Sequence, residues 1–135
     1  MYSPRGKRTR PTSDLLRQAL FNILGERIRG ARVLDLFAGS GAVGLEALSR
    51  GAATATFVES DRHAVESLRA NLVTLKLAEC AWLMAADVFQ ALSRLQATGE
   101  RFDCIFLDPP YAGELAVKCI EILADGALLR ENPVL

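Results

Sequence analysis

The feature that most constrains the fold of this chain is a regular alternation of short apolar runs with longer segments of helical periodicity. Four runs have the length of a strand, at residues 32–37, 54–59, 81–86 and 102–107. They lack a clear alternation of polar and apolar residues, which is typical of strands covered on both faces. The pattern predicts one α/β domain of the Rossmann-like type, with a parallel sheet flanked by helices.

The segments between the runs predict the helices. Thr12 or Ser13 is expected to cap a first helix that ends near Gly25 and whose apolar positions are Leu16, Ala19, Leu20, Ile23 and Leu24. Other helices are expected at residues 42–50 before Gly51, after Asp87, at residues 114–125 before Gly126, and at residues 62–78 with an apolar stripe of Val65, Leu68, Leu72 and Leu75. Trp82 and most of the phenylalanines are expected in the core.

Composition limits the class of protein. The chain has 135 residues, of which 50% are hydrophobic and 24% charged, so we expect one soluble globular domain. Its apolar stretches are far shorter than the roughly 18 residues of a membrane span, and the basic N-terminus is not followed by the apolar segment of a signal peptide. We therefore expect a cytoplasmic protein without a membrane partner, and a monomer.

The metal-binding residue types are few and scattered. Cys80, Cys104 and Cys119 are odd in number and far apart, and His63 is the single histidine. Buried thiols are the favoured interpretation of the cysteines. Because no Cys or His is accompanied by a cluster of carboxylates, we expect no metal site.

Charge is unevenly distributed along the chain. The formal net charge is zero, but residues 1–32 hold eight Lys and Arg against two Asp and Glu. A basic segment beside a more acidic body suits a polyanion that contacts one face, because phosphate contacts supply affinity independent of sequence. The alternative is a solvated tail, and with the reaction loop described below we favour a nucleic acid.

A glycine-rich loop follows the first apolar run. Gly39-Ser-Gly41-Ala-Val-Gly44 has the spacing of a dinucleotide-binding turn, and Glu59 ends the next run where an acid can accept hydrogen bonds from ribose hydroxyls. Phe37, Ala38 and Ser60 border these positions and are further candidates for cofactor contact. A glycine turn that only permits tight packing is the structural alternative.

Asp35 discriminates between two kinds of cofactor. It lies four residues before Gly39, where a carboxylate would repel the pyrophosphate of a nicotinamide dinucleotide but tolerate the cationic sulfonium and ammonium groups of S-adenosylmethionine. Asp35 can also accept hydrogen bonds from backbone N–H groups of the glycine turn, and both roles can coexist. The residue therefore favours S-adenosylmethionine.

Two residues after the third run are candidates for the adenine of the cofactor. Asp87 can meet the adenine amino group and Val88 can cover the ring. Asp87 is equally well placed to be the N-cap of the following helix, so the sequence leaves both roles open.

The fourth apolar run is followed by Asp108-Pro109-Pro110-Tyr111, which determines the expected chemistry. Two prolines fix the backbone and donate no N–H, which leaves carbonyl oxygens free to accept from a ligand. Hydrogen bonds to the Asp108 carboxylate and the Pro109 carbonyl can orient an exocyclic base amine for methyl transfer. Tyr111 can stack on the target base once that base has left its stack in the nucleic acid. A turn that merely ends a strand is the alternative interpretation.

Together these segments resemble the bacterial 16S rRNA guanine-N2 methyltransferases of the RsmD type. The resemblance spans nearly the whole chain and rests on Arg10-Pro-Thr-Ser-Asp14, Leu20-Phe-Asn22, Asp35-Leu-Phe-Ala-Gly-Ser-Gly41, Glu59 and Asp108-Pro-Pro-Tyr111. It implies a class I methyltransferase fold, S-adenosylmethionine as cofactor, and a guanine of 16S rRNA in the small subunit or its assembly intermediate as substrate. It also implies that the Arg10-Pro11-Thr12 segment and the helix after it border the methionine end of the cofactor.

Family members of this type continue through further strands, whereas a fifth strand only begins here at Asn132-Pro-Val-Leu135. A fourth strand without a neighbour would expose unpaired backbone groups at an edge. We therefore expect a sheet truncated after the fourth or early fifth strand, with residues 1–12 as a basic segment and residues 13–135 as the cofactor-binding domain.

Two other functions fit the same motifs. The reaction loop also suits an amino-methyltransferase for DNA adenine or protein glutamine. From another class, the glycine loop suits an NAD-dependent oxidoreductase or a nucleotide-binding module without catalysis.

Overall fold

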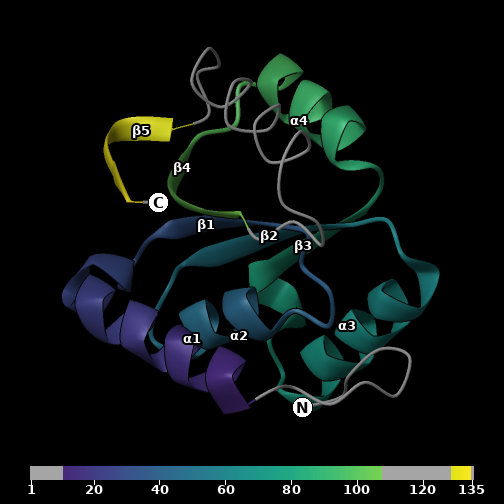
Figure 1. The fold of residues 1–135 in the computed structure, drawn as a ribbon. Helices are drawn as coiled ribbons and strands as arrows, with labels where there is room; N and C mark the ends of the chain where they lie inside the picture. Colours follow the sequence, from purple (N-terminus) through teal and green to yellow (C-terminus); the bar gives the residue numbers. More distant parts are fainter. Residues whose placement is uncertain (1–10, 108–128, 135) are drawn as a thin grey trace.

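A parallel sheet forms the centre of the computed structural model, which describes residues 11–107 and 129–134 (Figure 1). Its strand order is β3-β2-β1-β4-β5. The strands are β1 (Arg32–Leu36), β2 (Thr54–Glu59), β3 (Ala81–Ala85), β4 (Phe102–Leu107) and β5 (Leu129–Val134). The four strands expected from the apolar runs are confirmed. The fifth strand begins earlier than the predicted Asn132, because β5 starts at Leu129 and pairs in parallel with β4.

Helices cover both faces of the sheet. They are α1 (Pro11–Leu24), α2 (Ala42–Ser49), α3 (Arg62–Thr74) and α4 (Val88–Ala97), with short 3-10 turns η2 (Gly25–Ile28) and η3 (Ala78–Cys80). In Figure 1, α1, α2 and α3 lie on one side of the sheet and α4 lies on the other. The helix expected at residues 114–125 lies outside the described residues.

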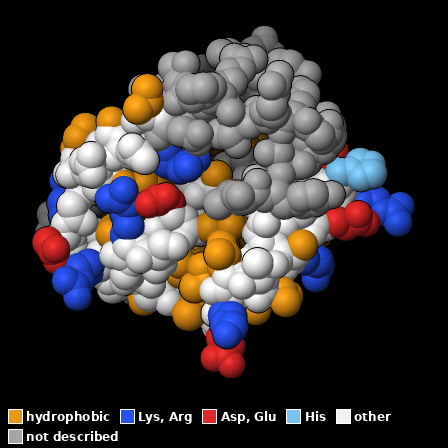
Figure 2. Space-filling model, turned by 90° about the horizontal axis from the view of Figure 1, so that it is seen from below, with side chains coloured by type: hydrophobic (Ala, Val, Ile, Leu, Met, Phe, Trp, Pro, Cys, Tyr) orange, Lys and Arg blue, Asp and Glu red, His pale blue; other side chains and the backbone are white. Residues whose placement is uncertain are grey.

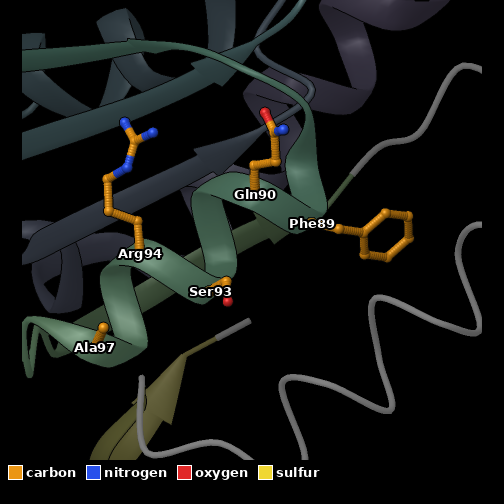
Figure 3. Close-up of a pocket in the computed structure, with 5 residues that line it drawn as sticks. All are labelled: Phe89, Gln90, Ser93, Arg94 and Ala97. Atoms are coloured by element: carbon orange, nitrogen blue, oxygen red, sulfur yellow. The ribbon is translucent and has the colours of Figure 1, made fainter.

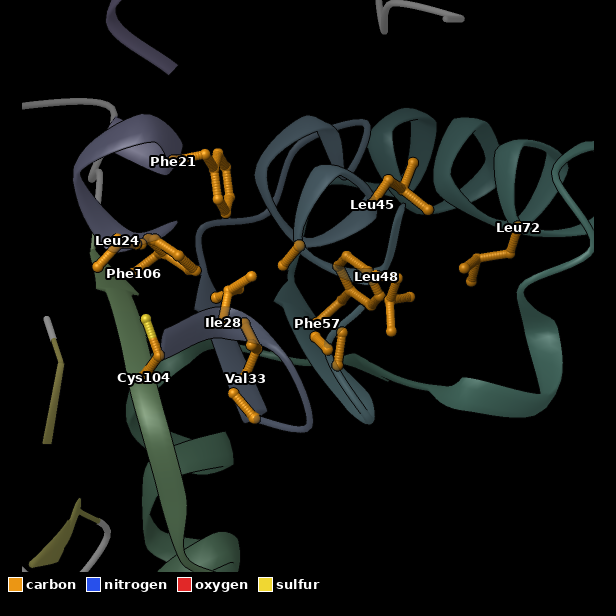
Figure 4. Close-up of a cluster of buried hydrophobic side chains, with 14 of the residues drawn as sticks. Phe21, Leu24, Ile28, Val33, Leu45, Leu48, Phe57, Leu72, Cys104 and Phe106 are labelled. Atoms are coloured by element: carbon orange, nitrogen blue, oxygen red, sulfur yellow. The ribbon is translucent and has the colours of Figure 1, made fainter. Parts of the chain in front are cut away.

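Two apolar clusters fill the space between helices and sheet. Alternate residues of β1 point to opposite faces, so Val33 joins the cluster under α1, α2 and α3, and Leu34 joins the one under α4. Figure 4 shows the first cluster, in which Phe21 of α1 lies near Phe106 of β4 with ring centroids 5.6 Å apart. Both faces of β1 are therefore buried, as the unalternating sequence predicted.

The first helix differs from its prediction in two ways. It begins at Pro11, so Thr12 and Ser13 lie inside the helix and the expected cap position is wrong; proline is favoured in a first helical turn because it has no N–H to leave unbonded. Its buried side centres on Phe21 and Leu24, whereas Ala19 is exposed and Ile23 is 78% exposed. Among the α1 side chains that the structure describes, the fully buried ones form a narrow stripe, and the apolar spacing alone did not identify which stripe.

Trp82 is 59% exposed, which corrects its expected place in the core. It lies on β3, which pairs with β2 on one side and forms an end of the strand order given for the described sheet. An edge strand has a neighbouring strand on one side only, so an apolar residue near its start is not necessarily covered.

The third helix is shorter than the expected residues 62–78, because it ends at Thr74. The N–H of Leu77 donates to the carbonyl of Leu72 and that of Lys76 to the carbonyl of Val73, which is the hydrogen-bond pattern of a Schellman motif. Lys76 has φ +59° as this motif requires. The last residue of the expected stripe, Leu75, falls in this turn and is 48% exposed.

Candidate cofactor-binding site

The ends of the central strands place the sequence motifs on one rim of the sheet. Leu36, the last residue of β1, is in register with Leu107, the last residue of β4, and with Val58 of β2. The glycine loop therefore starts beside the point where the reaction loop starts. In α/β sheets of this kind, ligands bind outside the carboxyl ends of strands where the strand order reverses, which here is between β1 and β4.

The glycine loop has an unusual backbone from its first residue. Phe37 has φ +60°, a conformation that costs a bulky residue on the order of 1–2 kcal/mol, and Gly39 and Gly41 have φ +60° and +91°. The Phe37 side chain packs against the cluster under α4. Packing of the ring thus holds the chain in a tight turn directly after the strand.

Asp35 joins the loop to the helix that follows it. The residue is 4% exposed, and its Oδ2 accepts a hydrogen bond of 3.0 Å from the backbone N–H of Gly44 in the first turn of α2. The N-cap residue of α2 is Gly41, which has no side chain to cap with. Asp35 therefore supplies the cap from the neighbouring strand, which is one of the two roles that the sequence allowed.

Glu59 ties the loop to the second strand. Its Oε1 accepts from the backbone N–H of Gly39 at 2.7 Å, and its Oε2 accepts from that of Asp61 at 2.9 Å. Asp61 in turn caps α3 by accepting from the N–H of Ala64. Ser60 between them is exposed. The expected ribose acceptor thus lies against the glycine loop, and carboxylate oxygens have further lone pairs for a ligand.

The three glycines have different surroundings. A Cβ on Gly44 would overlap the Phe57 ring, and one on Gly41 would overlap Leu68, so Gly44 allows α2 to pack closely on β2 and Gly41 allows the loop to pack closely on α3. A Cβ on Gly39 would meet no atom of the described residues within 4 Å. Gly39 is therefore the open glycine, where a ligand can approach the backbone.

Asp87 follows β3 on the same rim. Its Oδ2 accepts from the N–H groups of Phe89 at 3.0 Å and Gln90 at 3.4 Å, so the residue is the N-cap of α4. Its side chain is exposed and Val88 beside it is buried. The capping role is shown, and contact with adenine stays a prediction.

The remaining predicted residues are placed less fully. Thr12 lies in the first turn of α1. Asp108, Pro109, Pro110 and Tyr111 lie outside the described residues, directly after Leu107.

The structure also reveals a residue that sequence reasoning missed: Asn71 of α3, whose Nδ2 donates to the carbonyl of Ser40 at 3.0 Å. The available signal was a polar residue between Leu68 and Leu72 on the buried side of α3.

The charge of the site fits a cationic cofactor. Carboxylates lie at or near the carboxyl ends of three neighbouring strands, with Asp35 on β1, Glu59 on β2 and Asp87 after β3. Residues 35–41 contain no Lys or Arg that could neutralise a pyrophosphate. The open backbone at Gly39 and this acidic set fit S-adenosylmethionine, whose sulfonium and ammonium groups are positive.

An open hollow of about 620 Å³ lies elsewhere, along one face of α4 (Figure 3). It is lined by Phe89, Gln90, Ser93, Arg94 and Ala97. None of the glycine-loop residues lines it. Because the acidic rim and the open glycine lie outside it, we do not assign the cofactor to this hollow.

Surface charges are mixed on the face formed by α1, α2 and α3. Figure 2 shows basic and acidic side chains beside one another there. Ion pairs account for several of them, including Arg50 with Glu46 at 2.7 Å and Arg62 with Glu66 at 3.6 Å. Four of the eight basic residues on which the nucleic-acid prediction was based lie outside the described part of the chain, namely Arg5, Lys7, Arg8 and Arg10.

The described part of the chain contains neither a cluster of potential metal ligands nor a helix that could span a membrane. Within residues 11–107 and 129–134, there is no group of three or more His, Cys, Asp or Glu side chains placed to hold a metal ion. In the same residues, every helix is too short or too polar to span a bilayer.

The strand order, the glycine loop and the acidic rim define the class: the fold is that of class I S-adenosylmethionine-dependent methyltransferases. The same fold occurs in the SAM-dependent methyltransferase of Agrobacterium tumefaciens, with a TM-score of 0.75 at 22% identity over 93% of this chain and 43% of that one. The chain belongs to the family described as Conserved hypothetical protein 95, whose model matches residues 1–135. This match, together with the relatives described next, confirms the resemblance to RsmD-type proteins.

Two relatives illustrate the family. Ribosomal RNA small subunit methyltransferase D of Escherichia coli K12 is 41% identical over 126 residues, covering 93% of this chain. The solved structure of the hypothetical protein TTHA0928 of Thermus thermophilus is 42% identical, with a TM-score of 0.81 over 96% of this chain and 73% of that one. The chain spans 62% of the length of the E. coli relative.

Proposed function

We propose that this protein transfers a methyl group from S-adenosylmethionine to the exocyclic N2 amino group of a guanine in 16S rRNA. The observation that carries the proposal is the register of Leu36 with Leu107, which starts the cofactor loop and the reaction loop side by side. The family supports the substrate, since the E. coli relative is named a ribosomal RNA small subunit methyltransferase.

The proposed cofactor site consists of the glycine loop and the acidic rim. Asp35 and the backbone of Phe37, Ala38, Gly39 and Gly41 would hold the methionine end together with Thr12. Glu59 and Ser60 would hold the ribose, and Asp87 and Val88 the adenine. When bound, S-adenosylmethionine supplies an electrophilic methyl group. Carboxylates on three adjacent strands favour this positively charged group over a dinucleotide.

The proposed reaction loop positions the acceptor base. The Asp108 carboxylate and the Pro109 carbonyl would accept hydrogen bonds from the guanine amine, whose lone pair is otherwise delocalised into the ring. Pro110 would keep the loop rigid, and Tyr111 would stack on the guanine base after the base has left its stack in the RNA. The Asp108 carboxylate would take the proton that the amine loses, while fixed geometry supplies most of the rate acceleration.

The proposed partner is 16S rRNA in the small ribosomal subunit or in its assembly intermediate. The protein would bind it as a monomer in the cytoplasm. The basic residues 5–10 would contribute phosphate contacts. Such contacts make affinity fall with salt, so binding to rRNA should weaken steeply as the salt concentration rises from about 50 to 200 mM.

The first experiment separates the cofactors. Titration calorimetry with S-adenosylmethionine, S-adenosylhomocysteine and NADH should show binding of the first two and none of the third. Binding of NADH alone would indicate an oxidoreductase or a nucleotide-binding module and would overturn the proposal.

The second experiment identifies the substrate. Methyl-labelled S-adenosylmethionine is incubated with naked 16S rRNA, 30S subunits, DNA and protein, and the products are digested to nucleosides or amino acids. We expect label on N2-methylguanosine from rRNA or 30S subunits. Label found only on adenine of DNA, or only on glutamine of protein, would contradict the guanine assignment.

A further inference from the structure

We propose that Asn71 of α3 is a positioning residue that holds the glycine loop in the conformation that binds the cofactor. The inference rests on the proposed function, because it concerns how the chain receives S-adenosylmethionine. Asn71 belongs to a helix that none of the assigned cofactor residues comes from. It acts on the site through the backbone of the loop.

The polar contact is direct and shielded from water. Asn71 is 7% exposed, and its Nδ2 donates a 3.0 Å hydrogen bond to the carbonyl of Ser40. Ser40 lies between Gly39, which is open to a ligand, and Gly41, which is packed. A buried amide on α3 therefore reaches the middle of the loop.

The peptide unit between Ser40 and Gly41 is fixed at both of its polar groups. Its carbonyl accepts from Asn71, and its N–H donates to the carbonyl of Ala38 at 2.9 Å. Because Gly41 readily changes its φ angle, this peptide unit can rotate when one bond is lost. Rotation would release Ser40, the residue next to the open Gly39, from its fixed position in the loop.

An apolar contact from the same helix supports the loop beside the hydrogen bond. Leu68, fully buried and one turn before Asn71, lies where a Cβ on Gly41 would be. The loop is also bonded to β1 through Asp35 and to β2 through Glu59. Helix α3 thus holds the loop in addition to β1 and β2, through the apolar contact of Leu68 and the hydrogen bond of Asn71.

The consequence for binding follows from the energy of one hydrogen bond. Without Asn71 the loop can visit conformations that do not bind, and the fraction of competent molecules falls. The net contribution of one hydrogen bond corresponds to an affinity loss of about 2- to 13-fold. We therefore expect weaker cofactor binding with the chemical step preserved.

The test compares two changes at Asn71 with a matched control. Asn71→Leu keeps the number and branching of the side-chain heavy atoms without a donor, and Asn71→Asp keeps the shape but replaces the donating NH2 by an oxygen. Leu72→Val alters a buried neighbour on α3 that belongs to the apolar cluster, and it supplies a loss of thermal stability for comparison. Dissociation constants for S-adenosylmethionine and S-adenosylhomocysteine are measured by calorimetry on each protein.

We expect both Asn71 variants to bind about 3- to 10-fold more weakly than wild type, and Leu72→Val within about twofold. With a methyl acceptor, the KM for the cofactor should rise while kcat at saturating cofactor stays within about twofold, a division that loss of folded protein would not produce.

The outcomes separate this inference from the proposed function. If wild type fails to bind S-adenosylmethionine, the proposed function is wrong and the cofactor role of Asn71 falls with it. If wild type binds and the Asn71 variants bind equally well, the function stands and the positioning role is overturned. Failure of both variants to fold would also overturn it, because the residue would then be structural.

Discussion

The carboxylates proposed to bind the cofactor also accept hydrogen bonds from backbone N–H groups of the protein. Asp35 caps α2, Asp87 caps α4, and Glu59 accepts from Gly39 and Asp61. A substitution at any of them would therefore disturb local structure together with the site. Asp108, which directly follows β4, is the better residue for separating catalysis from cofactor binding.

Replacement of Asp108 tests the reaction loop. Asp108→Asn removes the charge and the proton acceptor at nearly constant size, so we expect turnover to fall by about 100-fold or more, since a general base contributes roughly 10²–10⁴-fold. Single-turnover methyl transfer gives the rate, and calorimetry gives the affinity for S-adenosylmethionine, expected within a few fold of wild type. A collapse of cofactor affinity would show that Asp108 faces the cofactor instead.

Cys104 of β4 is predicted to be an unreactive thiol. Burial raises its pKa from 9.0 to about 12, with nearby Asp103 and Asp35 also raising it and Arg27 opposing. Near neutral pH the thiolate that reacts with disulfide reagents is therefore scarcely formed. Mass-spectrometric mapping after brief labelling should find the partly exposed Cys80 modified and Cys104 unmodified.

The same pKa has a consequence for stability. Between pH 9.0 and about 12 the folded protein keeps a proton that the unfolded chain releases, so this contribution is present below pH 9.0 and is lost as pH rises. Urea unfolding of wild type and Cys104→Ala, at several pH values on either side of pH 9.0, should show the smaller decline in the variant. Equal declines would contradict the buried, neutral thiol.

At the scale of elements, three helices end in the same way. The N–H of the second residue past the cap donates to the third carbonyl from the helix end in α2, α3 and α4: Ala52 to Ala47, Leu77 to Leu72, and Glu100 to Leu95. The left-handed position is a glycine in α2 and α4, at Gly51 and Gly99, but Lys76 in α3. This is why the sequence predicted the end of α2 at Gly51 and missed the end of α3.

Lys76→Gly is therefore expected to stabilise the protein. Glycine adopts φ near +59° without the steric cost that lysine has, and this gain exceeds the extra entropy of the unfolded glycine by about 0.5–1 kcal/mol. This gain in the free energy of unfolding corresponds to a rise of about 2–5 °C in Tm, which calorimetry would measure. Lys76→Ala is the control and should remain near wild type; equal stabilisation by alanine would indicate that removal of the charge was responsible.

At the scale of the whole molecule, distances between layers decide what a position tolerates. Gly44 lies in the first turn of α2 and faces Phe57 of β2, whose ring occupies the space of a Cβ. A helix position normally prefers alanine to glycine by about 1 kcal/mol. Here that local preference opposes the close approach of helix and sheet.

Gly44→Ala is expected to destabilise the protein by about 1–3 kcal/mol, because the extra methyl group forces α2 away from a close-packed sheet. Urea unfolding gives the change. The control is the same substitution in a Phe57→Leu background, where a smaller side chain leaves room, so the cost should be lower than in wild type. An equal cost in both backgrounds would exclude the contact with Phe57 as the cause.

Much of the architecture followed from the sequence because strands and helices depend on neighbouring residues. The runs at residues 54–59 and 102–107 match β2 and β4 at both ends. The glycine loop and Glu59 were also identified from spacing alone, and in the structure the Gly39 nitrogen and the Glu59 Oε1 lie 2.7 Å apart. Exposure was less predictable: Ile23 and Trp82 are apolar yet exposed, since burial depends on which elements lie above them.

The sequence by itself determined the alternation of strands and helices, the glycine turn and the order of the acidic residues along the chain, because each is set by local spacing and side-chain chemistry. Tertiary structure alone decided that Asp35 caps α2 from a strand, that Asn71 reaches Ser40, and that Gly44 lies against Phe57. These contacts join residues distant in the chain. They exist only because the order of strands and the packing of helices bring those residues within a few ångströms, and spacing along one chain does not encode that distance.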